Sequence, residues 1–183
     1  MKITLITVGK IKDLTGIVAD TNISEAILAQ CDSAGVDCYP SIEGLAKVQS
    51  FKHANMYFDQ VTNLIWFVNS LQREVFNVLA TTGTKVPQTE PGLEIIRTAI
   101  RGVCNQAVTN GYVAPGQWNS PDTFGNYDDF MRNIEEFGFY DYHQPVAEQA
   151  QSERETRQAP VWQIAAKESG AVHSANILVY VEA

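Results

Sequence analysis

Two pairs of adjacent carboxylates are the residues of this sequence best suited to chemistry. The pairs are Asp128-Asp129 and Glu135-Glu136, and His143 follows them. Carboxylate and imidazole groups bind divalent cations, and they also serve as general acids and bases. One hypothesis is therefore a small acidic metal-dependent enzyme or ligand-binding protein that uses these five residues. Adjacent acids on a helix point in different directions, which weighs against a shared site.

Other catalytic motifs are missing from the sequence. It contains no GxSxG, GxGxxG or HExxH, and the GTK segment at 83–85 lacks the upstream glycine spacing of a phosphate-binding loop. The cysteines Cys31, Cys38 and Cys104 form no CxxC pair, so neither a disulfide framework nor a zinc site is predicted. We expect no catalytic residue, no metal and no cofactor, which favours a protein that is not an enzyme.

Length and composition indicate an ordinary folded domain. The chain has 183 residues, 45% of them hydrophobic and 19% charged, so we expect a single domain over residues 1–183. The net charge of -8 has the wrong sign for a protein that neutralises many phosphates, and nucleic acid is not an expected partner. No stretch approaches about 18 uninterrupted apolar residues, so we expect no membrane span and no signal peptide.

The negative charge is concentrated between residues 122 and 155. Only two arginines, Arg132 and Arg154, accompany the acids there. This pattern is typical of a solvated acidic face, and a surface that meets a basic partner is the alternative. The acids of this region are Asp122, Asp128, Asp129, Glu135, Glu136, Asp141, Glu148, Glu153 and Glu155.

Hydrophobic periodicity predicts the elements that position these residues. Apolar side chains at steps of three and four predict a long amphipathic helix from Phe58 to Leu79, and a second one follows from Pro91 to Gly111. A short helix is expected over 128–137, an aromatic strand after it, and two strand-like runs at 161–167 and 171–182 around a turn. The predicted class is α/β of the α+β type: a mixed β-sheet flanked by two long amphipathic helices, with a C-terminal β-hairpin.

The last strand is apolar on both faces. Its residues Ile177, Val179 and Val181 alternate with Leu178 and Tyr180. Such a strand requires cover on both sides, from its own subunit or from another. A strand at a chain end is also suited to extending a neighbour's sheet, so these five residues are candidates for a subunit interface.

A polar segment precedes the final strands. Glu148 to Gln158 has almost no apolar stripe, so burial in a core does not hold it in place. A solvated surface helix is one interpretation. The other is a polar interface, with Arg154 and Arg157 as its candidate contact residues.

From about Leu14 to its end, residues 14–183, the chain resembles the C-terminal part of the contractile tail sheath proteins of myophages and prophages. Residues 1–13 do not share the resemblance and are expected to form a first strand. Four stretches occur in the same order as in that family. They are Phe58–Leu79 (FDQVTNLIWFVNSLQREVFNVL), Thr84–Gly92 (TKVPQTEPG), Asn110–Asn119 (NGYVAPGQWN) and Gln151–Val181, which contains SERETRQAP and AAKESGAVHSANILVYV.

The resemblance implies a structural subunit and no catalysis. Sheath proteins of this kind are usually longer, and their C-terminal domain lines the inner wall of a helical tube of subunits, with terminal strands exchanged between neighbours. The implied partners are other copies of the chain, a tail tube protein and baseplate proteins. The implied location is the virion tail, with assembly in the host cytoplasm. Arg154 and Arg157 would face the tube, and contraction would follow from a change of subunit contacts.

Overall fold

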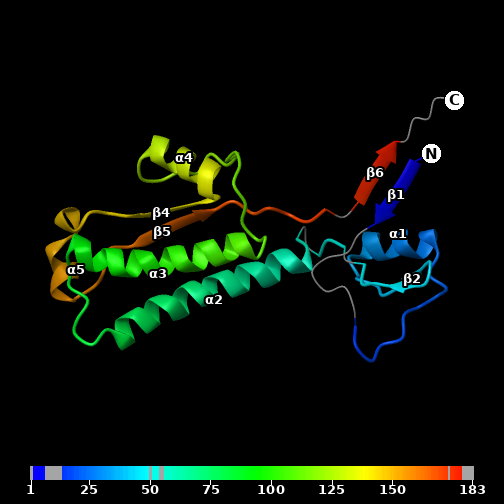
Figure 1. Ribbon diagram of the computed structural model, residues 1–183, viewed down its shortest axis with the longest axis horizontal. Coiled ribbons are helices and arrows are strands. Elements are labelled where there is room, and N and C mark those ends of the chain that lie inside the picture. The colour runs from blue at the N-terminus through cyan, green and yellow to red at the C-terminus, as the bar shows by residue number, and fades with distance from the viewer. Residues whose placement is uncertain (1, 7–13, 50, 54–55, 173, 179–183) are drawn as a thin grey trace. The chain divides into compact units, whose positions relative to one another are not determined.

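The computed structural model describes residues 2–6, 14–49, 51–53, 56–172 and 174–178 (Figure 1). The chain divides into two compact units, one made of residues 1–64 with 170–183 and the other of residues 65–169. The described residues combine five α-helices with three two-stranded sheets, and each sheet is antiparallel. The predicted α+β class with two long amphipathic helices is confirmed. No helix in the described ranges is both long and apolar enough to cross a membrane.

The described part of the first unit contains helix α1, two strand pairs and the first residues of α2. Helix α1 (Glu25–Ala34) is capped by the Ser24 side chain and ends at Gly35 in the left-handed conformation. Strands β2 (Ser41–Ile42) and β3 (Leu45–Ala46) form a short hairpin. Strand β1 (Lys2–Ile6) runs antiparallel to β6 (Ser174–Leu178), so the two ends of the chain share one sheet.

Two long helices carry the core of the second unit. Helix α2 (Phe58–Thr81) and helix α3 (Glu90–Thr109) lie along each other in Figure 1. The apolar stripe of α3 is buried from Leu93 to Ala107, because it meets α2 on one side and the β4–β5 sheet on the other. Gly92 is required at the start of α3, because a Cβ there would lie 2.0 Å from the Pro87 carbonyl oxygen.

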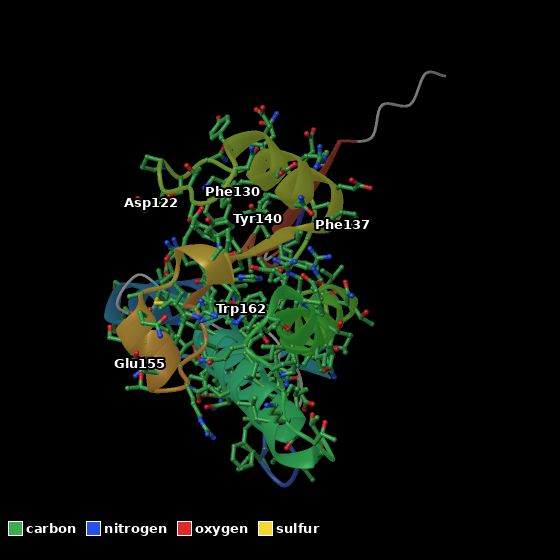
Figure 2. The ribbon with its side chains drawn as sticks, turned by 90° about the vertical axis from the view of Figure 1, so that its left-hand side faces the viewer. Asp122, Phe130, Phe137, Tyr140, Glu155 and Trp162 are labelled. Carbon is green, nitrogen blue, oxygen red and sulfur yellow. The ribbon has the colours of Figure 1, made fainter. Side chains whose placement is uncertain are left out.

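An antiparallel strand pair lies between α3 and a short helix. Strand β4 (Phe139–His143) pairs with β5 (Trp162–Ala166). Side chains alternate across the pair: Phe139 joins the core with α3, whereas Tyr140 packs against Phe130 of α4 (Tyr127–Phe137). The rings of Phe130 and Tyr140, both labelled in Figure 2, are 5.2 Å apart between centroids and meet edge to face. Both faces of β4 are therefore covered.

The two predicted C-terminal strands are present as β5 and β6. Each hydrogen-bonds with an earlier strand of the chain, β5 with β4 and β6 with β1. The polar segment between β4 and β5 is less helical than the sequence predicts. It consists of a 3₁₀ turn, η1 (Val146–Glu148), and a single short helix, α5 (Gln151–Glu155).

Candidate assembly surfaces

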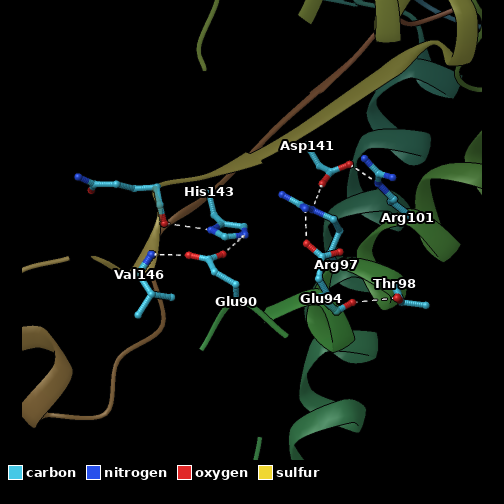
Figure 3. Close-up of polar contacts among 9 residues, drawn as sticks. Glu90, Glu94, Arg97, Thr98, Arg101, Asp141, His143 and Val146 are labelled. Atoms are coloured by element: carbon cyan, nitrogen blue, oxygen red, sulfur yellow. Dashed lines mark hydrogen bonds and ion pairs between the residues drawn. The ribbon is translucent and has the colours of Figure 1, made fainter. Parts of the chain in front are cut away.

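A buried ion-pair cluster fixes β4 to α3 (Figure 3). The Asp141 side chain is 1% exposed, and its two oxygens accept hydrogen bonds from Arg97 Nε at 2.8 Å and Arg101 Nε at 2.7 Å. Arg97 also pairs with Glu94 and lies over the Trp162 ring at 5.5 Å. Because both carboxylate oxygens are satisfied by arginine donors, the charge is tolerated inside the fold. The prediction of a solvated acidic face is wrong for Asp141.

The same cluster influences a buried thiol. Cys104 of α3 is fully buried, and burial raises its pKa to about 12, with the Asp141 charge adding to the rise and the Arg101 charge opposing it. Burial likewise raises the pKa of the Tyr140 hydroxyl on the other face of β4. Both groups are neutral at physiological pH, and neither has the lowered pKa of an activated nucleophile.

His143 lies in a second polar contact at the start of α3 (Figure 3). Its Nδ1 donates to the Gln144 carbonyl oxygen at 3.0 Å, and its Nε2 is 3.9 Å from Glu90 Oε2. The other oxygen of Glu90 accepts from the Val146 amide at 2.7 Å. The ring packs on Trp162 with centroids 4.4 Å apart. These contacts place the end of β4 on the first turn of α3.

The residues of the metal-site hypothesis are not assembled into a site. Asp129 pairs with Arg132 on its own helix, and His143 is directed to Glu90. Glu135 and Glu136 are exposed at the far end of α4, after the first turn that holds Asp128. Among the described residues, no three His, Cys, Asp or Glu side chains come together as a metal site would require. The geometry gives the enzyme hypothesis no support.

One flank of α2 presents apolar side chains to solvent. Within the second unit these are Ile65, Val68, Phe76 and Leu79, with exposed fractions from 43% to 67%. Their spacing places them on one side of the helix, next to the stripe through Phe67, Leu71 and Val75 that packs in the core. We call these four residues the α2 stripe. A group of exposed apolar side chains on one side of a helix is typical of a contact with another protein.

The two predicted tube-facing arginines are exposed. Arg154 is the last basic residue of α5, and Arg157 follows it with a positive φ of 59°. Neither guanidinium group forms an ion pair with any carboxylate in the described ranges. The backbone beneath them is anchored, since the Gln158 carbonyl oxygen accepts from the side chains of Gln88 at 3.0 Å and Gln149 at 2.9 Å. A fixed backbone thus presents two unpaired positive charges.

The predicted interface strand is described only in part. Ile177 and Leu178 lie in β6, opposite Ile3 and Lys2 of β1, whereas Val179, Tyr180 and Val181 are outside the described residues. The β1–β6 sheet contains two strands, and these contact chiefly each other among the described elements. Each strand therefore has an outer edge that no other described strand occupies.

Comparison with known proteins agrees with this architecture. Residues 58–181 match the family model described as E217 tail sheath protein gp31-like, C-terminal domain. The matched range runs from the first residue of α2 past the end of β6, and it includes the Asp141 cluster, α5 and the α2 stripe. The chain belongs to this family of tail sheath C-terminal domains. Its role is accordingly a structural one in a phage-type tail.

A solved structure shows the same fold over nearly the whole chain. It is described as the cryo-EM structure of the anti-feeding prophage (AFP) baseplate, 6-fold symmetrised. The match has a TM-score of 0.56 at 13% sequence identity, and covers 94% of this chain and 44% of the other. The chain thus spans less than half the length of that relative. No curated protein sequence matches.

Sequence reasoning missed two features of these surfaces. The Asp141 cluster was detectable in part, because Arg97 and Arg101 stand four residues apart on α3 and so share a face. The α2 stripe was also detectable in part, because the apolar residues of that helix span a wider face than one neighbouring helix covers.

Proposed function

We propose that this chain is a subunit of a contractile tail sheath, which assembles head to tail with other copies around a tail tube. It acts by a change in subunit contacts and not by catalysis. The observation that carries the proposal is the two-stranded sheet of β1 and β6, whose two outer edges are occupied by no other described strand. An isolated two-stranded sheet is marginally stable in water, so strands from neighbouring subunits would complete it.

In this account the last strand forms the subunit contact. Ile177 and Leu178, with Val179, Tyr180 and Val181 beyond them, would extend a neighbour's sheet by main-chain hydrogen bonds. A contact of this type joins two different surfaces, so it repeats from copy to copy and builds a helix. The β4–β5 pair is covered by α3 and α4 and would form the rigid body of each subunit. The strand contacts would join one such body to the next.

The two exposed arginines at and after α5 give the domain a surface suited to contact with a tube. Arg154 and Arg157 are exposed on an anchored backbone, and carboxylates on a tail tube protein would pair with them. Baseplate proteins would nucleate the assembly and hold it in the extended state. The subunit contacts of the contracted state would be more stable than those of the extended state. Contraction would then release this difference in free energy. The location is the virion tail, after assembly in the host cytoplasm.

Removal of the last strand tests the strand contact. A variant that ends before Ser174 should stay folded in the unit of residues 65–169, because the described core clusters of that unit consist of residues between 66 and 166. Circular dichroism should show its helices intact, while sedimentation velocity should show that the higher assemblies of the full chain are lost. Equal assembly by the shortened and full chains would contradict the proposal.

A further inference from the structure

The α2 stripe is symmetric about its centre. Ile65 and Leu79 lie seven residues before and after Gln72, and Val68 and Phe76 lie four residues before and after it. Steps of four and seven residues return to the same side of a helix, so the exposed Gln72 lies in the middle of the stripe. The stripe therefore has the same apolar spacing when the helix is read in either direction.

This symmetry favours one occupant, a second copy of the same helix. When one α2 is rotated half a turn about an axis that passes through Gln72 and is perpendicular to the helix, the two stripes face each other in antiparallel directions. Ile65 then meets Leu79 of the second copy, and Val68 meets Phe76 of the second copy. The two Gln72 side chains meet at the axis, where each amide can both donate and accept a hydrogen bond.

The charges along α2 also favour a second copy. The chain has a net charge of -8, so two copies repel each other where their acids meet. No charged residue lies between positions 60 and 72, and the adjacent Arg73 and Glu74 pair with each other at 3.2 Å. A strongly charged partner finds no opposite charge along the stripe, whereas a second copy meets no uncompensated like charge there.

We propose that the chain free in solution forms a two-fold dimer, in which the α2 stripes of two copies pair antiparallel about Gln72. The four stripe residues are 43% to 67% exposed and offer roughly 400 Å² per copy, at about 150 to 250 Å² for a large side chain. The pair buries about 800 Å², which is less than the roughly 1,200 Å² of a stable complex, so the dimer is weak and reversible. Such a contact closes on itself and does not repeat from copy to copy, so the inference goes beyond the proposed function.

Site-specific crosslinking of the full chain tests the dimer. The half-buried Cys31 and Cys38 are replaced by alanine, and the fully buried Cys104 is kept. In this chain Gln72→Cys should form a disulfide between two copies under a copper–phenanthroline oxidant, because position 72 meets itself at the axis. Asn77→Cys, at an exposed position on another side of α2, is the control and should crosslink about tenfold more slowly or less. Equal rates for the two variants would show that a second copy does not cover the stripe, and would overturn the proposal.

Mixing two variants tests the direction of the pairing. Ile65→Cys mixed with a size-tagged Leu79→Cys chain should give a linked dimer that contains one of each. Either variant alone should give little, since equal positions at these ends of an antiparallel pair lie about 21 Å apart at about 1.5 Å per residue. Faster linking of Ile65→Cys with itself than with Leu79→Cys would mean a parallel contact and would contradict the two-fold pair.

Substitutions at the axis give a change in each direction. In the mixed crosslinking assay, Gln72→Leu should raise the yield of the linked dimer because it adds apolar contact. Gln72→Glu should lower the yield by about tenfold or more, because two like charges meet at the axis. Asn77→Glu adds the same charge away from the stripe and should leave the yield unchanged. Circular dichroism checks that all three variants are folded, and equal yields for Gln72→Glu and Asn77→Glu would reject Gln72 as the centre of the contact.

Discussion

Arg101 of α3 donates from Nε to Oδ1 of Asp141 on β4 at 2.7 Å, and the carboxylate is buried. Arg97, one helical turn earlier, occupies the other oxygen at 2.8 Å. Strand β4, whose two faces are covered, is thus also held to α3 by ion pairs, because Asp141 accepts from two arginines at once. This contact determines where β4 lies on α3, and with it the position of the loop that carries α5.

Asp141→Asn should destabilise the chain by about 3 kcal/mol, because it leaves two arginines facing an amide that donates towards them. Urea unfolding followed by circular dichroism measures the change. Asp128→Asn is the matched control, since that carboxylate is exposed on α4, and it should alter the free energy of unfolding by less than about 0.5 kcal/mol. Equal effects of the two substitutions would show that the buried cluster contributes nothing specific.

Alkaline pH should destabilise the second unit through Cys104. Burial raises the pKa of this thiol from its ordinary value of 9.0 to about 12, so the folded state holds its proton longer than the unfolded chain does. The resulting stabilisation is complete below about pH 9 and is lost as pH rises towards 12, by at most about 4 kcal/mol. Chemical unfolding at a series of pH values measures it.

Cys104→Ala separates this effect from the packing role of the residue. The variant should be about 1 kcal/mol less stable than the natural chain at neutral pH, because a buried sulfur is lost. Its stability should then fall less steeply above pH 9. Part of the decline in stability should remain in the variant, because burial also raises the pKa values of Tyr112 and Tyr140. Parallel pH profiles for the two proteins would exclude Cys104 as the source.

The α2 stripe should contribute to association and not to folding. Phe76→Glu places a charge on a side chain that is 67% exposed, so its effect on the free energy of unfolding should stay within about 0.5 kcal/mol. The sedimentation coefficient at high protein concentration should fall, because a charge in an apolar contact is costly to desolvate. Asn77→Glu adds the same charge at an exposed position on another side of α2 and should leave association unchanged. Identical association by all three proteins would remove the stripe from the interface.

Charge reversal of Arg154 and Arg157 to glutamate should leave the fold intact, because both side chains are exposed. Binding to the tail tube protein, measured by co-sedimentation, should fall by about tenfold or more and should become less sensitive to salt. Reversal of Arg73, an exposed arginine on α2, is the control and should not alter binding. Undiminished tube binding by the double variant would contradict the proposal that Arg154 and Arg157 face the tube.

Local patterns explain which elements were predictable. The helix from Phe58 was predicted at its first residue, and the alternation of Phe139 with Tyr140 follows from the aromatic run that indicates a strand. Contacts between distant segments left weaker signals. The pairing of β1 with β6 joins the two chain ends, and neither strand carries a residue type that specifies the other.

Immunogold electron microscopy of the tails shows directly whether the protein forms the sheath. Antibodies against this protein would be applied to purified phage-like particles that contain it, before and after contraction. A sheath subunit should give gold label along the full length of the extended tail, and along a shorter and wider sleeve after contraction. Label confined to the baseplate end, or absent from intact particles, would contradict it.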